Sequence, residues 1–256
     1  MMRVDSEETN SQRRWLEPYL GQSTGSASIM GKLAEAFKQS LTYPQILIWL
    51  LWIAFPIYGF FASNRLLPPD DGYSLHVVMA SLTGNLSAVE PLVFMVFNLL
   101  GVIPMAYALL VLFDGKEQPL PAWPFVIASF FAGAFGILFY VALRRWGRDV
   151  EGTRSQLQQR LDSRVGPAIL LIVSILLVIV GTGGSMQTYL DLWQTKPLVH
   201  VMTLDLVILL LVLPFLAIDD MRRRNVQGRA WKMLVALLPV FGVLIYLVAR
   251  PKLSDA

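Results

Sequence analysis

Six long apolar runs alternate with polar segments along the chain. They cover residues 43–62, 88–113, 122–143, 166–182, 198–218 and 232–249. A helix needs about 20 apolar residues to cross roughly 30 Å of hydrocarbon at about 1.5 Å per residue. The pattern therefore predicts an all-α integral membrane protein with six transmembrane helices. The fourth run is the shortest, and it ends at the glycine-rich sequence 181–184.

Composition agrees with a membrane-embedded chain. Hydrophobic residues make up 55% of the sequence and charged residues only 15%, where soluble domains carry about a quarter. Cysteine is absent, which excludes disulfides, thiolate metal sites and cysteine nucleophiles. The net charge of +3 is too small to predict nucleic-acid binding.

A phrase at the end of the third run returns at the end of the sixth. The sequence FGILFYVALRR begins at Phe135, and FGVLIYLVARP begins at Phe241. The likeness extends backwards through Trp123 and Trp231, at an offset of about 106 to 108 residues. We interpret this as a duplicated hairpin, in which two apolar runs are joined by a short loop that opens with aspartate.

One further run precedes each hairpin, which predicts two three-helix units. Because three spans reverse the direction of the chain, we expect the units to form an inverted repeat. The expected organisation is a polar N-terminal tail with an amphipathic, interfacial segment (1–42), a first unit (43–145), a basic cytoplasmic connector (146–165), a second unit (166–250) and a short tail (251–256).

The charges of the two hairpin loops are consistent with inversion. The loop from Asp114 to Pro121 carries one lysine against one aspartate and one glutamate, whereas the loop at 219–231 carries four arginines. Since lysine and arginine favour the cytoplasmic side, the second loop is predicted inside and the first outside. This topology also puts both termini outside, which conflicts with the basic residues of the N-terminal tail.

Residues at the ends and in the middle of the closing runs have expected structural roles. Arg144, Arg145 and Arg250 are predicted to end the runs by extending to the membrane surface. Gly136 and Gly242 are predicted to admit a neighbouring helix at close range.

Asp205 is an ionisable residue inside the fifth apolar run, seven residues from its start. That places it roughly 10 Å deep, where a carboxylate costs about 2.5–3.5 kcal/mol on insertion scales. Asn98 stands at the matching place in the second run, and His200 lies about one turn before Asp205. We predict that these residues form either a proton or cation site or a hydrogen-bonded helix pair.

The second hairpin carries a family resemblance. Its acidic residue, basic loop, Trp231, Pro239, Gly242 and Tyr246 resemble the two-span membrane anchor at the N-terminus of cardiolipin-synthase-like phospholipase D proteins. The catalytic His/Lys/Asp signature of that family is missing, so the resemblance implies an anchor-like hairpin without the activity. The first hairpin resembles uncharacterised polytopic proteins of cyanobacteria and plastids, which implies a plasma or thylakoid membrane.

The motifs of soluble enzymes are missing from the sequence, including a nucleophile elbow, a zinc-binding H-x-x-x-H and a phosphate-binding loop. We therefore predict no catalytic residues, cofactor or metal site. The leading prediction is a non-catalytic assembly or scaffold component of a membrane complex. The alternatives are a small secondary carrier or ion-coupled transporter that uses an inverted repeat, and a lipid- or pigment-modifying enzyme. The expected partners are the lipid bilayer and either another membrane protein or a second copy of the chain.

Overall fold

A computed structural model describes most of the chain. The described residues are 31, 33–38, 40, 42–59, 66–114, 118–147 and 156–252. All regular structure in these ranges is helical, which confirms the all-α prediction. The predictions for residues 1–30 and 253–256, which belong to the two tails, lie outside the described residues.

Three helices are long and apolar enough to cross a membrane, which is consistent with a membrane-embedded protein. They are α6 (Pro91–Val111), α7 (Trp123–Leu143) and α11 (Pro197–Arg223). A fourth candidate results if α9 (Val165–Gly181) and α10 (Met186–Thr195), which meet at 96°, count as one bent span. By length and composition the candidate spans number three or four, so the prediction of six transmembrane helices is wrong for the described residues.

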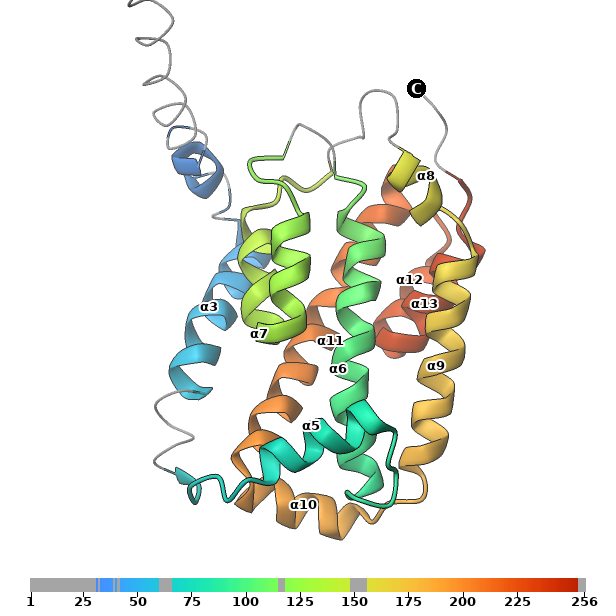
Figure 1. Ribbon diagram of the computed structural model, residues 1–256. Helices are drawn as coiled ribbons and strands as arrows, with labels where there is room; N and C mark the ends of the chain where they lie inside the picture. Colours follow the sequence, from blue (N-terminus) through green and yellow to red (C-terminus); the bar gives the residue numbers. More distant parts are fainter. Residues whose placement is uncertain are drawn as a thin grey trace, which may run out of the picture.

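The remaining helices are shorter. Two are apolar, α3 (Tyr43–Ile57) and α13 (Pro239–Ala249). The others are α5 (Tyr73–Thr83), α8 (Gln156–Leu161) and α12 (Arg229–Leu237), and residues 33–38 ahead of α3 are also helical. In Figure 1, α5 and α10 lie across one end of the molecule, and α8 lies at the other.

Helices α6 and α11 form the centre of the fold and run in the same direction (Figure 1). The buried Tyr107 of α6 donates a hydrogen bond to the Leu209 carbonyl of α11 at 2.8 Å. Asp114, just beyond the end of α6, is 2.7 Å from Arg223 at the end of α11. The inverted repeat is not shown, because inversion would make these two helices antiparallel.

Helix α9 runs opposite to α6 and packs along it. At the far end of the pair, a Cβ on Gly181 would lie 2.5 Å from the Met95 sulfur. Glu90 caps α6 there, because one of its carboxylate oxygens accepts from the Leu92 and Val93 amides. Its other oxygen accepts from the Ser185 amide at 2.8 Å. A single carboxylate therefore fixes the start of α6 against the turn between α9 and α10.

Helix α7 reverses direction in its middle. Gly133 has φ 52° and ψ −131°, a conformation that only glycine adopts readily. Three residues later, a Cβ on Gly136 would lie 2.6 Å from the carbonyl carbon of Ala128. Residues eight positions apart in a straight helix are about 12 Å apart along its axis. The two halves of α7 therefore fold against each other as a helical hairpin, which Figure 1 shows.

The segment of α12 and α13 folds back in the same way. Helix α12 ends at Leu237 and α13 begins at Pro239, which suits a first helical position because it has no N–H to satisfy. A Cβ on Gly242 would lie 2.3 Å from the Leu234 carbonyl oxygen. Gly136 and Gly242 thus allow close approach within their own hairpins, where we expected a neighbouring helix.

These two reversals explain why the predicted topology is wrong. The runs 122–143 and 232–249 are apolar enough to span, but each begins and ends at the same end of the molecule. The start of α3 joins this end, since Gln45 donates to the Ala142 and Arg144 carbonyls at 2.9 and 3.0 Å. Arg224 brings the C-terminal segment there by donating to the Pro251 carbonyl at 2.6 Å. Asp114 and residues 118–121 therefore lie at the same end as residues 219–231, where we predicted opposite sides.

Candidate functional site

Asp205 caps the broken helix α7. Its Oδ1 atom accepts a hydrogen bond of 2.7 Å from the Ala134 amide, at the start of the second half of α7. Its carboxylate also fills the space beside Gly133, where a Cβ would overlap it. A buried amide left without an acceptor costs about 1–3 kcal/mol. The carboxylate that we predicted as an ion site or a helix-pairing group is thus bound to backbone.

His200 lies in an aromatic setting one turn before Asp205. Its Nε2 atom is 2.5 Å from the Tyr58 hydroxyl and its Nδ1 atom is 3.0 Å from the Trp193 carbonyl oxygen. The imidazole stacks on the Trp193 ring at 4.4 Å between centroids. Both nitrogens therefore have partners, and the ring ties α3 and α10 to the start of α11.

Asn98 is engaged elsewhere. Its Nδ2 group donates to the Phe94 carbonyl at 2.8 Å and to the Ser81 hydroxyl at 3.2 Å. The second contact holds α5 on α6. Among the described residues, no hydrogen bond joins any two of Asn98, His200 and Asp205, so the structure does not bring the three predicted residues together as one site.

A cluster of four buried charges, here the first quartet, joins the ends of α6, α7 and α11. It consists of Asp114, Arg144, Asp219 and Arg223. Arg144 binds both oxygens of Asp114, at 2.6 and 2.9 Å, and lies 2.8 Å from Asp219. Arg223 lies 2.7 Å from Asp114 and 3.3 Å from Asp219. Two aspartates and two arginines make the quartet electrically neutral.

The second quartet joins the end of α11 to α8 and to the end of α13. It consists of Asp162, Asp220, Arg224 and Arg250. Arg224 lies 2.9 Å from Asp220 and 2.8 Å from Asp162. Arg250 lies 3.1 Å from Asp220, and the ring of the buried Phe113 lies beneath both guanidinium groups.

The aspartate at the centre of each quartet also binds a tyrosine. Tyr140 donates to Asp114 at 2.5 Å, and Tyr246 donates to Asp220 at 2.8 Å. Arg144 is 2% exposed and Arg250 is 5% exposed, so the prediction that these arginines extend to the membrane surface is wrong. Both arginines stay buried because aspartates pair with them and neutralise their charge. Without these carboxylates, burying the guanidinium groups would be too costly.

The arginines of the first quartet keep Asp114 ionised. Burial of Asp114 disfavours the charged form, but the charges of Arg144 and Arg223 outweigh burial and hold the pKa of this carboxyl below its ordinary value. The folded-state pKa is thus lower than the unfolded one. The stability that this ion pair contributes is present above about pH 4 and is lost as the pH falls through the lowered pKa.

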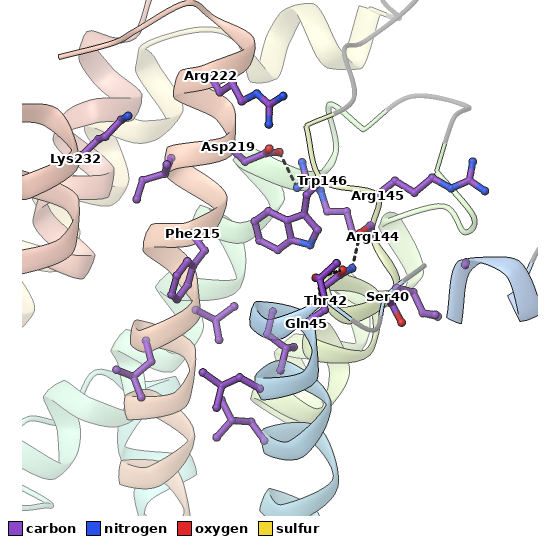
Figure 2. A pocket seen from close by; sticks show the side chains of 18 of the residues that line it. Ser40, Thr42, Gln45, Arg144, Arg145, Trp146, Phe215, Asp219, Arg222 and Lys232 are labelled. Atoms are coloured by element: carbon purple, nitrogen blue, oxygen red, sulfur yellow. Dashed lines mark hydrogen bonds and ion pairs between the residues drawn. The ribbon is translucent and has the colours of Figure 1, made fainter. Parts of the chain in front are cut away.

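A cavity of about 880 Å³ lies beside the first quartet, between α3 and α11. Figure 2 shows the Trp146 ring among the lining side chains, with Phe215 and Asp219 of α11 on one side and Thr42 and Gln45, at the start of α3, on the other. The deeper wall is apolar, and the wall near the charged quartets carries basic and amide side chains. The described residues contain no group of three or more histidine, aspartate or glutamate side chains that could hold a metal ion.

Comparisons with protein-family models, with curated proteins and with solved structures found no match. The two resemblances noted in the sequence therefore stay predictions. What the chain does has to follow from the buried quartets, the capped hairpin and the cavity.

Proposed function

We propose that this protein is a non-catalytic membrane component, an assembly or scaffold protein whose two units repeat in the same orientation. The matching quartet contacts support a duplication. Asp114, Tyr140 and Arg144 meet in the first quartet, and Asp220, Tyr246 and Arg250, each 106 residues later, meet in the second. The two units form a direct repeat if each has the same three parts. One helix runs away from the end with the quartets, the next runs back to it, and a hairpin then begins and ends there.

The observation that carries the scaffold proposal is the pair of neutral, buried quartets. They tie α6, α7, α11, α13 and α8 together at one end of the molecule. Alternating access requires units to rock against each other around a central site. Separating these ion pairs would leave charges buried and uncompensated, which costs about 3–5 kcal/mol for each broken pair. The fold therefore favours a fixed shape over a moving one.

Purification of the intact complex from membranes tests this function. We expect the full-length chain, solubilised in a mild detergent, to co-purify in a fixed ratio with a second membrane protein or with a second copy of itself. A chain that migrates as a monomer, with no companion in a fixed ratio, would overturn the scaffold proposal.

The alternative carrier function rests on Asp205, a carboxylate in the apolar part of α11. We expect Asp205→Asn to retain stability within about 1 kcal/mol, because an amide oxygen can still accept from the Ala134 amide. Asp205→Leu is expected to cost about 1–3 kcal/mol, because that buried amide loses its acceptor. Unfolding of the purified variants in detergent measures both values.

Proton flux separates the two functions. We expect proteoliposomes of the native chain and of Asp205→Asn to show the same background proton leak under a pH gradient. Proton movement by the native chain that disappears in Asp205→Asn would establish the carrier and reject the scaffold. The enzyme alternative has no residue cluster among the described residues that favours it.

A further inference from the structure

The cavity between α3 and α11 carries surplus positive charge at its outer end. Its described lining includes four cationic side chains, Arg144, Arg145, Arg222 and Lys232, against one anionic side chain, Asp219. Arg144 and Asp219 neutralise each other at 2.8 Å. The described residues form no ion pair or hydrogen bond with the side chains of Arg222 and Lys232. The charge of this wall suits an anion.

The inner wall of the cavity is apolar and continuous with the outer surface. It is formed by Leu47, Ile48 and Leu51 of α3 and by Leu211, Val212 and Phe215 of α11. Leu47, Leu211 and Phe215 are 52%, 57% and 47% exposed, so they also face the space around the protein. Seven residues of α11, about 10 Å, separate Phe215 from Arg222. The cavity thus runs from apolar depth to the charged rim.

Trp146 places a hydrogen-bond donor between these two walls. Its Nε1 atom is buried and has no hydrogen-bond partner, although tryptophan N–H groups usually find one when buried. The ring packs on the Arg144 guanidinium at 5.1 Å and lines the cavity (Figure 2). A ligand that accepts a hydrogen bond beneath its charged group would satisfy this donor.

We propose that this cavity binds one membrane phospholipid with a net negative headgroup. The phosphate lies toward Arg222 and Lys232, an ester oxygen accepts from Trp146, and the start of an acyl chain lies along Leu211 and Phe215. The volume falls within the range of about 300–1,000 Å³ for small-molecule sites, and the remaining acyl chain stays in the bilayer. Basic loops put this end on the cytoplasmic side, where anionic lipids gather.

Native mass spectrometry of the full-length protein in detergent tests the site. Phosphatidylglycerol and phosphatidylcholine of the same acyl chains are titrated separately. We expect phosphatidylglycerol to bind at one copy per chain and more tightly than phosphatidylcholine. The double variant Arg222→Gln/Lys232→Gln is expected to weaken phosphatidylglycerol binding about 30-fold, at about tenfold or less for each basic residue removed.

A matched double variant controls for net charge. Arg160→Gln/Arg229→Gln removes two exposed arginines of the same end that do not line the cavity, and we expect unchanged binding. Trp146→Phe keeps the ring and removes only the donor, with an expected weakening of about fivefold. Thermal unfolding of each variant without added lipid verifies that the fold is intact; we expect it to be, since the side chains of Arg222 and Lys232 form no hydrogen bond or ion pair with the described residues.

Soluble glycerol phosphate distinguishes a lipid from a free anion. At millimolar concentration it should leave bound phosphatidylglycerol in place, because it lacks the acyl chain. Displacement of the lipid by glycerol phosphate would overturn the proposal in favour of a soluble anion. Equal binding of the two lipids, or equal weakening by the two double variants, would also overturn it. The result does not depend on whether the protein is a scaffold or a carrier.

Discussion

Arg144→Met is expected to lower the free energy of unfolding by about 3–5 kcal/mol. The variant leaves Asp114 and Asp219 buried with only Arg223 to neutralise them. Titration with a denaturing detergent, followed by tryptophan fluorescence, measures the loss. Arg250→Met removes the corresponding arginine of the second quartet, and we expect a loss of similar size.

Two further variants show whether buried charge is the cause. Arg160→Met removes an exposed arginine of α8, and we expect a change of less than about 1 kcal/mol, as for surface ion pairs. Adding Asp219→Asn to Arg144→Met restores a neutral quartet, and we expect it to recover part of the loss. If Arg144→Met lowered the free energy of unfolding no more than Arg160→Met, the quartet would be a solvated surface cluster. The interpretation that the quartets hold the helix ends in a fixed arrangement would then be wrong.

Gly136→Ala is expected to destabilise the protein by about 1–3 kcal/mol or to prevent folding. The new methyl group would lie 2.6 Å from the Ala128 carbonyl carbon, and backbone cannot move aside as a flexible side chain can. Gly242→Ala, with the Leu234 carbonyl oxygen at 2.3 Å, is expected to behave alike. Unfolding in denaturing detergent and the yield of folded protein measure both effects.

Gly101→Ala is the matched control, because Gly101 lies inside α6 and a Cβ there meets nothing within 4 Å. Alanine favours a helix over glycine by about 1 kcal/mol, so we expect this variant to be neutral or more stable. A Gly136→Ala variant as stable as Gly101→Ala would show that α7 runs straight through residue 133.

The sequence predicts the helical segments well and their path poorly. The run 88–113 contains α6, the run 122–143 nearly coincides with α7, and the run 198–218 lies within α11. Apolar composition predicts that a segment lies in hydrocarbon. A straight span and a hairpin that reverses at one glycine have nearly the same composition, so composition does not distinguish them. Gly133 and Pro239, which stand 106 residues apart, are ordinary residues in membrane helices. Only the backbone conformations of Gly133 and of Leu238, just before Pro239, show that the chain turns there.

The buried quartets were also hidden in the sequence. An arginine that ends an apolar run, such as Arg144, can extend to the membrane surface or pair with a buried carboxylate. The sequence of the run is the same in both cases, so it does not distinguish them. The partner of Arg144 is Asp114, 30 residues earlier, so no local pattern connects them. The sequence does carry one signal. Asp114, Tyr140 and Arg144 each have an identical residue 106 positions later, at Asp220, Tyr246 and Arg250. The position of Asp205 inside an apolar run marks it as unusual, but its partner is a backbone amide, which has no sequence signature.

The absence of cysteine allows a direct test of the same-orientation fold. Single cysteines introduced at Pro121, Gln227 and Lys252, all exposed at the charged end, can be labelled in intact cells or sealed vesicles with a membrane-impermeant maleimide. Cysteines at Asn85 and Gln187 are exposed at the other end. We predict that positions 121, 227 and 252 react from one side of the membrane and positions 85 and 187 from the other. Labelling of positions 121 and 227 from opposite sides would contradict the two same-sided hairpins.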